Sequence, residues 1–223
     1  MAKVFLGVGH GGKDPGAVAN GLKEKDLNLV IATACHEELV RHGVSVLMSR
    51  TKDDTEDLVD RIKECNAFLG KDGLALDIHC NAGGGDGAEA FYHLGGGKGK
   101  TLANNILAEV VKIGQNSRGA KTKKNSSGSD YYGFIRSTSS PAVIFEAAFL
   151  DNKNDIKILD TVEEQKAMGV AIAKGVLKTL GIAYKEKVVD TKMYRVQVFA
   201  GSKTGAEAMV KKLKSVGIQG IIV

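Results

Sequence analysis

Apolar runs and amphipathic stretches alternate along most of this chain. Short runs rich in branched and aromatic residues predict strands, and segments whose apolar residues recur every three or four positions predict helices. The expected strands are 3–8, 44–50, 74–78, 88–94 and 142–149, and the expected helices are about 26–41, 55–69, 98–113 and 161–180. Strands that alternate with helices are typical of an α/β fold. We therefore expect a mixed, mostly parallel sheet with helices on both faces.

Two of the expected strands end at a histidine. The run KVFLGV leads into the glycine-rich turn that contains His10, and LALDI leads directly into His79. In open α/β sheets, the carboxyl ends of the strands form the edge where sites are usually found. Glu24 precedes the helix expected from about residue 26 and could reach the same edge from a loop. Two imidazoles and one carboxylate are a ligand set for a catalytic Zn²⁺, which leaves one position open. The grouping favours a hydrolase, although each residue taken singly could be an ordinary polar surface residue.

A further carboxylate, Glu146, lies inside the apolar run PAVIFEAAFL. Burying an ionised carboxylate is costly unless it meets a cation, a metal site or hydrogen-bond donors. Beside a metal, such a group could act first as general base and then as general acid. The alternative is a partly exposed residue at the edge of the sheet, paired with Lys or Arg.

Three blocks of the sequence resemble the zinc-dependent N-acetylmuramoyl-L-alanine amidases of the amidase type 3 family. The blocks are VGHGGKDPGAVANGLKEKD (8–26), DIHCNAGGGDGAEAFY (77–92) and PAVIFEAAFLDNKND (141–155). They occur in the family's order across roughly residues 1–182. Two departures stand out: Gly-Val-Gly-His replaces the commoner Asp-Pro-Gly-His, and Asp77 occupies a position where Ser is usual.

The resemblance implies a site and a reaction. It assigns His10, Glu24 and His79 as zinc ligands and Glu146 as the catalytic carboxylate. It implies hydrolysis of the amide that joins N-acetylmuramic acid to L-alanine in peptidoglycan. Two alternatives stay open: a zinc peptidase that cuts the stem peptide, and a non-catalytic cell-wall-binding protein.

Composition and charge limit the kinds of binding partner that we expect. With 223 residues and 43% hydrophobic residues, the chain can form one sizeable core and a small additional unit. The net charge of +5 would suit nucleic acid or a polyanionic cell wall. Basic residues are scattered with few aromatics beside them, so we expect peptidoglycan and no nucleic acid as partner. No apolar run is long enough to predict a membrane span.

The beginning of the sequence bears on the cellular role. The first strand starts almost at once, without the charged and apolar leader of a secretory signal. We expect synthesis in the cytoplasm without a signal peptide and action on the cell wall after release. This favours a phage or prophage endolysin over a secreted autolysin, and a bacterial sporulation or mother-cell lysis enzyme stays open.

The last forty residues differ from the rest. We expect a catalytic zinc amidase domain over 1–182, a polar linker over 183–193 and a small β-α-β unit over 194–223. The unit resembles half of a SPOR-type peptidoglycan-binding repeat. Because so short a unit rarely folds alone, we expect it either to form a homodimer through a second copy or to dock onto the catalytic domain.

Overall fold

The computed structural model describes residues 1–187 and 202–214. It divides the chain into two compact units, Met1–Lys185 and Glu186–Val223. In the second unit, helix α7 (Lys203–Lys214) lies where the sequence predicts a helix. The two strands expected on either side of it lie outside the described residues, so the β-α-β unit and its SPOR likeness stay predictions.

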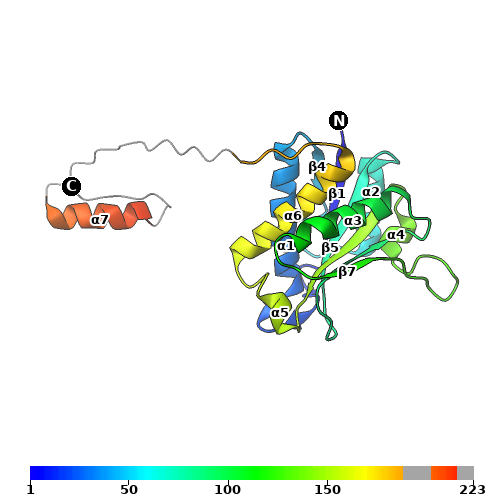
Figure 1. Ribbon diagram of the computed structural model, residues 1–223, viewed down its shortest axis with the longest axis horizontal. Helices are drawn as coiled ribbons and strands as arrows, with labels where there is room; N and C mark the ends of the chain where they lie inside the picture. The colour runs from blue at the N-terminus through cyan, green and yellow to red at the C-terminus, as the bar shows by residue number, and fades with distance from the viewer. Residues whose placement is uncertain (188–201, 215–223) are drawn as a thin grey trace. The chain divides into compact units, whose positions relative to one another are not determined.

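A six-stranded sheet forms the centre of the first unit (Figure 1). Its strands are β1 (Lys3–Val8), β4 (Ser45–Met48), β5 (Leu74–Asn81), β6 (Ala88–Tyr92), β7 (Ser117–Lys121) and β8 (Ala142–Phe149). They lie in the order β4-β1-β5-β8-β6-β7. The first four in this order are parallel, β6 is antiparallel to β8, and β7 is parallel to β6. The prediction of a mixed, mostly parallel sheet is confirmed.

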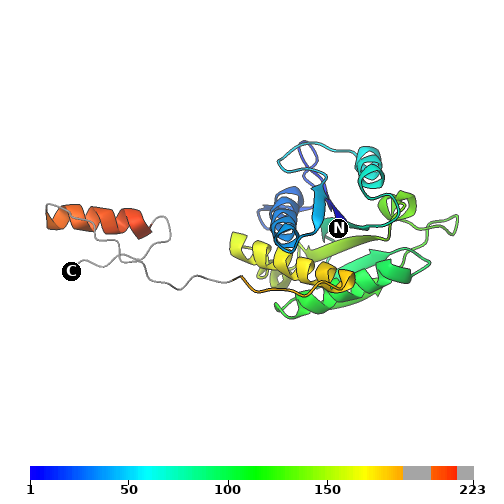
Figure 2. The ribbon, with the colours of Figure 1, turned by 90° about the horizontal axis from the view of Figure 1, so that it is seen from above.

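Helices cover both faces of the sheet (Figure 2). One layer contains α1 (Glu24–Arg41), α3 (Gly97–Val111) and α6 (Val162–Leu180), and the other contains α2 (Leu58–Leu69) and the short α4 (Gly133–Ser137). Strand residues alternate between the two apolar clusters: Val4 and Leu6 pack on the α1 side, and Phe5 packs on the α2 side. Because both faces of the sheet are covered, strand residues on either face are apolar, and the strands appear in the sequence as continuous apolar runs.

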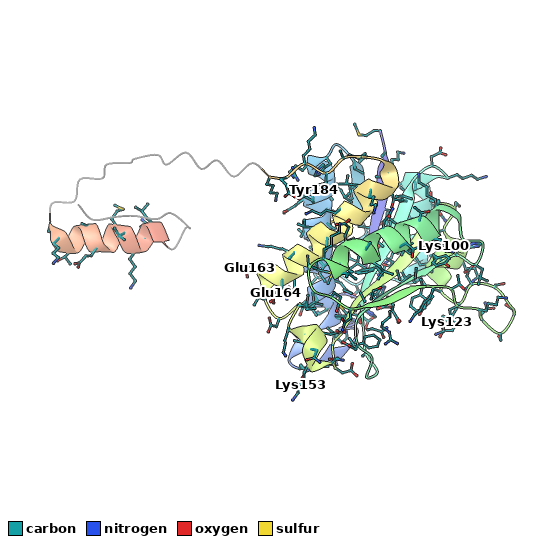
Figure 3. The ribbon with its side chains drawn as sticks, viewed as in Figure 1. Lys100, Lys123, Lys153, Glu163, Glu164 and Tyr184 are labelled. Carbon is teal, nitrogen blue, oxygen red and sulfur yellow. The ribbon has the colours of Figure 1, made fainter. Side chains whose placement is uncertain are left out.

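The ends of the helices follow local signals. Thr161 and Glu164 form a capping box that begins α6, and Gly181 ends it in a left-handed conformation. Glu163 and Glu164 lie at the beginning of this helix (Figure 3), where negative charge is favourable. Asp57 accepts a hydrogen bond from the Asp60 N–H and begins α2 three residues later than predicted.

Several elements differ from the predictions. Helix α1 begins at Glu24 and not near residue 26, and strand β5 continues to Asn81, so that His79 lies within it. The sequence did not indicate β7, α4, α5 (Lys153–Ile156), or the small hairpin of β2 (Val18–Ala19) and β3 (Leu22–Lys23). None of the helices among the described residues is long and apolar enough to cross a membrane.

Candidate metal and catalytic site

His10 and His79 come together where β1 and β5 end. Strand β1 pairs with β5 in parallel, and the Gly9 N–H continues the pairing by donating to the Ile78 carbonyl. A Cβ on Gly9 would lie 2.3 Å from the His79 ring, so glycine leaves the space which that ring fills. His10 follows with a φ of 62°, a left-handed conformation that is unusual outside glycine.

The three residues predicted as metal ligands form one cluster. One potential ligand atom from each of His10, Glu24 and His79 lies within 4.8 Å of the others. His10 Nε2 is 3.2 Å from Glu24 Oε2, and His79 Nδ1 is 3.1 Å from Glu24 Oε1. The two rings meet edge to face, with centroids 5.1 Å apart. The donor set and its spacing therefore fit a single Zn²⁺.

Glu24 reaches the cluster from the first residue of α1, and not from a preceding loop as the sequence suggested. It is only 3% exposed. Its Oε1 accepts from the Cys80 N–H at 2.9 Å and its Oε2 accepts from the Ala17 N–H at 2.9 Å. Burial raises the pKa of Glu24, but hydrogen bonds from the two histidines outweigh it, and the net pKa lies well below the ordinary value. The carboxylate is thus held ionised between the two imidazoles.

Each histidine also contacts a second carboxylate, which the sequence analysis did not assign. His10 Nδ1 lies 2.7 Å from Asp14 Oδ2, and His79 Nε2 lies 3.3 Å from Asp77 Oδ2. Burial lowers the pKa of His79, but the charges and hydrogen bonds of Asp77 and Glu24 raise it to about 10. Both rings are therefore oriented from two sides.

Glu146 lies on the strand next to His79. Strands β5 and β8 pair in parallel with His79 opposite Glu146. The side chain is partly buried, and its Oε2 is fully buried with no hydrogen-bond partner among the described residues. Burial raises the pKa of Glu146 to about 7, the nearby carboxylates add to the rise, and His79 opposes it. A carboxyl group with this pKa can both accept and return a proton near neutral pH. The alternative of an edge residue does not hold, because β8 lies between β5 and β6 in the interior of the sheet.

Glu89 is a neighbouring carboxylate. It lies opposite Glu146 on β6. It is 6% exposed and forms ion pairs with Arg118 at 2.9 Å and Lys121 at 2.5 Å. Because two cations neutralise it, Glu89 is held ionised and does not compete with Glu146 for a proton role.

A cleft of about 470 Å³ opens beside the cluster, on the face covered by α2 and α4. Its wall includes both histidines, the buried Asp77 and the side chains of Leu58 and Tyr132. The cleft gives a substrate access to the cluster. Cys80, which follows His79, is buried and its pKa is raised well above the ordinary value by burial, so it is no nucleophile.

The fold and the site define a class of protein: an α/β protein with a His-Glu-His cluster of metal-ligand type at the carboxyl edge of its sheet, and beside it Glu146, whose buried Oε2 has no hydrogen-bond partner among the described residues. The chain belongs to the Amidase_3 family, described as N-acetylmuramoyl-L-alanine amidase, whose sequence profile matches residues 4–178.

Three relatives support the assignment. The N-acetylmuramoyl-L-alanine amidase CwlM of Bacillus licheniformis is 35% identical, over 100% of this chain and 85% of that protein. The sporulation-specific N-acetylmuramoyl-L-alanine amidase of Bacillus subtilis (strain 168) is 33% identical, over 100% of this chain and 84% of that protein. The endolysin of Bacillus phage SPP1 is 34% identical, over 82% of this chain and 67% of that protein.

Solved structures of similar fold support the family assignment. Cwp6 from Clostridium difficile superposes with a TM-score of 0.77 at 36% identity, covering 80% of this chain and 29% of that one. The catalytic domain of CwlV, an N-acetylmuramoyl-L-alanine amidase from Bacillus (Paenibacillus) polymyxa var. colistinus, gives a TM-score of 0.72 at 27% identity, covering 82% of this chain and 100% of that one.

Proposed function

We propose that this protein is a zinc-dependent N-acetylmuramoyl-L-alanine amidase, which hydrolyses the amide between N-acetylmuramic acid and L-alanine in peptidoglycan. His10, Glu24 and His79 would hold the zinc, and Glu146 would carry the proton. The observation that supports this most is the meeting of a compact His-Glu-His cluster with a carboxyl group whose buried oxygen has no partner among the described residues.

Zinc and Glu146 would have different tasks in the hydrolysis. When bound, zinc polarises the scissile carbonyl and lowers the pKa of a water molecule. Glu146 accepts a proton from the attacking water as the new C–O bond forms. It then donates a proton to the alanine nitrogen as the C–N bond breaks, so that a lactyl carboxylate and a free amine leave. Burial raises the pKa of Glu146 above its ordinary value, which favours return of the proton, and the charge of a bound zinc ion would favour the ionised form that accepts it.

The charge distribution of the ligand cluster suits a cation. Glu24 is buried and ionised between two imidazoles, an arrangement that a divalent cation would neutralise. The cleft beside the cluster would receive the glycan-linked peptide, and the net positive charge of +5 would concentrate the protein on a polyanionic wall.

The decisive test compares Glu146→Gln with wild type on purified peptidoglycan. We expect the variant to keep its zinc and its fold and to lose at least about a hundredfold in rate, the usual scale for a lost general acid or base. The matched control is Glu38→Gln, which removes another buried carboxylate, roughly 21 Å along α1 from Glu24 at 1.5 Å per residue. A normal rate in Glu146→Gln would show that the proton carrier lies elsewhere.

Mass spectrometry of the digest separates the alternatives. An amidase releases intact stem peptides with a free N-terminal alanine, whereas a zinc peptidase releases fragments cut within the peptide. A non-catalytic wall-binding protein releases neither. Peptides cut within the stem would overturn the proposed bond specificity while leaving the metal site intact.

We further propose that the protein acts as a lysis enzyme of endolysin type, as the SPP1 relative is named. A role in sporulation is the second candidate. It is favoured by the two bacterial relatives, CwlM and the sporulation-specific amidase, whose matches extend over the whole chain. Transcription after prophage induction would support the first role, and transcription confined to sporulation would support the second.

A further inference from the structure

Asp77 is a buried charge directly behind one of the proposed zinc ligands. It is 1% exposed and lies two residues before His79 on β5, so that both side chains point to the α2 face of the sheet. Its Oδ2 is 3.3 Å from His79 Nε2. The neighbouring strand makes room for it, because a Cβ on Gly7 would lie 2.2 Å from Asp77 Oδ1.

Arg61 of α2 holds this carboxylate in place. Its Nη1 lies 3.2 Å from both carboxylate oxygens of Asp77, and its Nε donates to Glu56 Oε2 at 3.1 Å. Arg61 is itself only 4% exposed. A buried carboxylate is stable when it is paired and hydrogen-bonded on several sides, and this one has a guanidinium on one side and an imidazole on the other. The orientation of Asp77 is therefore fixed independently of His79.

His10, like His79, has a second carboxylate on the side of its ring that faces away from Glu24. In each ring, one nitrogen faces Glu24 and the other faces a second carboxylate, Asp14 for His10 and Asp77 for His79. A neutral imidazole carries one N–H, so the ring that donates outward presents its lone pair inward. Carboxylates in this outer position fix the tautomer and direction of metal-binding histidines.

The two outer carboxylates differ in exposure. The Asp14 side chain is 62% exposed, whereas the Asp77 side chain is 2% exposed. Solvent and salt screen the first contact and hardly reach the second. Asp77 is thus the stronger of the two constraints on the cluster.

We propose that Asp77 is a positioning residue that holds His79 with its proton on Nε2, so that Nδ1 is the metal ligand, and that Arg61 in turn fixes Asp77. The inference rests on the zinc site proposed above. The proposal gives a role to Asp77, which occupies a position where serine is usual in the amidase type 3 family.

The first test measures zinc affinity, by competition with a chromophoric chelator, in wild type, Asp77→Asn and Glu38→Gln. Asparagine keeps the size and an acceptor oxygen but removes the charge, and Glu38→Gln removes a buried carboxylate at the far end of α1. We expect Asp77→Asn to bind zinc about tenfold or more weakly, the scale for outer-shell substitutions, and Glu38→Gln to bind as wild type does. Equal affinity in folded Asp77→Asn, or an equal loss in the control, would overturn the proposal.

The second test uses the wild-type protein and so does not depend on how any variant folds. The ¹⁵N-labelled full chain is loaded with ¹¹³Cd²⁺, and the His79 ring is followed by NMR. We expect cadmium coupling to Nδ1 and a proton on Nε2. Coupling to Nε2 would overturn the assignment.

These outcomes separate the two proposals. Failure of the wild-type protein to bind zinc or cadmium in the cluster would refute the metal site itself. Metal that binds through His79 with an affinity indifferent to Asp77→Asn would leave the amidase site standing and refute only the role of Asp77.

Discussion

Substituting Glu146 by Gln should stabilise the metal-free protein, and the gain should grow as the pH rises. The carboxyl group has an ordinary pKa of 4.5, and burial in the fold raises it to about 7. Between these values the unfolded chain has released the proton and the folded chain still holds it. The contribution of this group to the free energy of unfolding is therefore most favourable below about pH 4.5. It is lost as the pH rises from about 4.5 through about 7. The amide introduced by Glu146→Gln has no such proton to lose.

The expected size follows from the same shift. A rise of the pKa from 4.5 to about 7 corresponds to about 3 kcal/mol at 1.36 kcal/mol per pH unit. Urea denaturation of both proteins after removal of metal, at pH 5, 6, 7 and 8, gives the difference in the free energy of unfolding. All other ionisable groups are common to both chains, so this difference reports residue 146 and its coupling to neighbours such as His79.

Only one direction of the pH trend is compatible with a raised pKa. The advantage of Glu146→Gln should increase from pH 5 toward pH 8, even though the same substitution is expected to slow turnover. A difference that stays flat within about 0.5 kcal/mol, the usual range for a neutral surface change, would refute the expected shift. So would an advantage that shrinks with rising pH.

Removing metal with a chelator should abolish turnover and Zn²⁺ should restore it, because the ligand set leaves a position open; undiminished clearing of cell walls by metal-free protein would contradict this. Alanine at His10, Glu24 or His79 should lower both bound zinc and activity, and full zinc occupancy in all three variants would show a wrong assignment. Alanine at Gly175 would place its Cβ 2.5 Å from the α3 backbone and should lower the stability by about 1–3 kcal/mol in urea denaturation; an unchanged midpoint would contradict the close packing of α3 and α6. Sedimentation of the full chain and of a version that ends at Lys185 decides how the C-terminal unit associates; a dimer of the full chain alone would support pairing with a second copy, and a monomer in both cases would rule out dimerisation through this unit and leave docking onto the catalytic domain.

The central sheet could be predicted because its strands are buried on both faces. Apolar runs such as KVFLGV and AVIFEAAF predict such strands, and helices between them indicate parallel pairing. The edge strand β7 reads SRGAK and has no apolar run, and α4 and α5 are too short for a helical period. Such elements depend on contacts from distant parts of the chain, which a local pattern does not contain.

The candidate site could be predicted in part. The pattern of the chain indicated all four residues: His10 and His79 by their positions after apolar runs, Glu24 by its position before a helix, and Glu146 by its apolar surroundings. The family resemblance assigned their roles, and strand β5 continues past His79 to Asn81. The pairing of Asp77 with Arg61 could not be predicted, because Arg61 reads as one more residue on the polar side of an amphipathic helix. The one available signal was a carboxylate inside the apolar run LALDI, which requires a buried partner without saying which one.

The backbone of His10 has a consequence for protein engineering. A non-glycine residue held at a φ of 62° costs on the order of 1 kcal/mol, and glycine would remove that strain. Glycine at residue 10 would also remove the ring that lies 3.2 Å from the buried Glu24 carboxylate, so the relief of backbone strain is set against the cost of that lost contact. A thermostable version of the protein therefore has to gain its stability elsewhere.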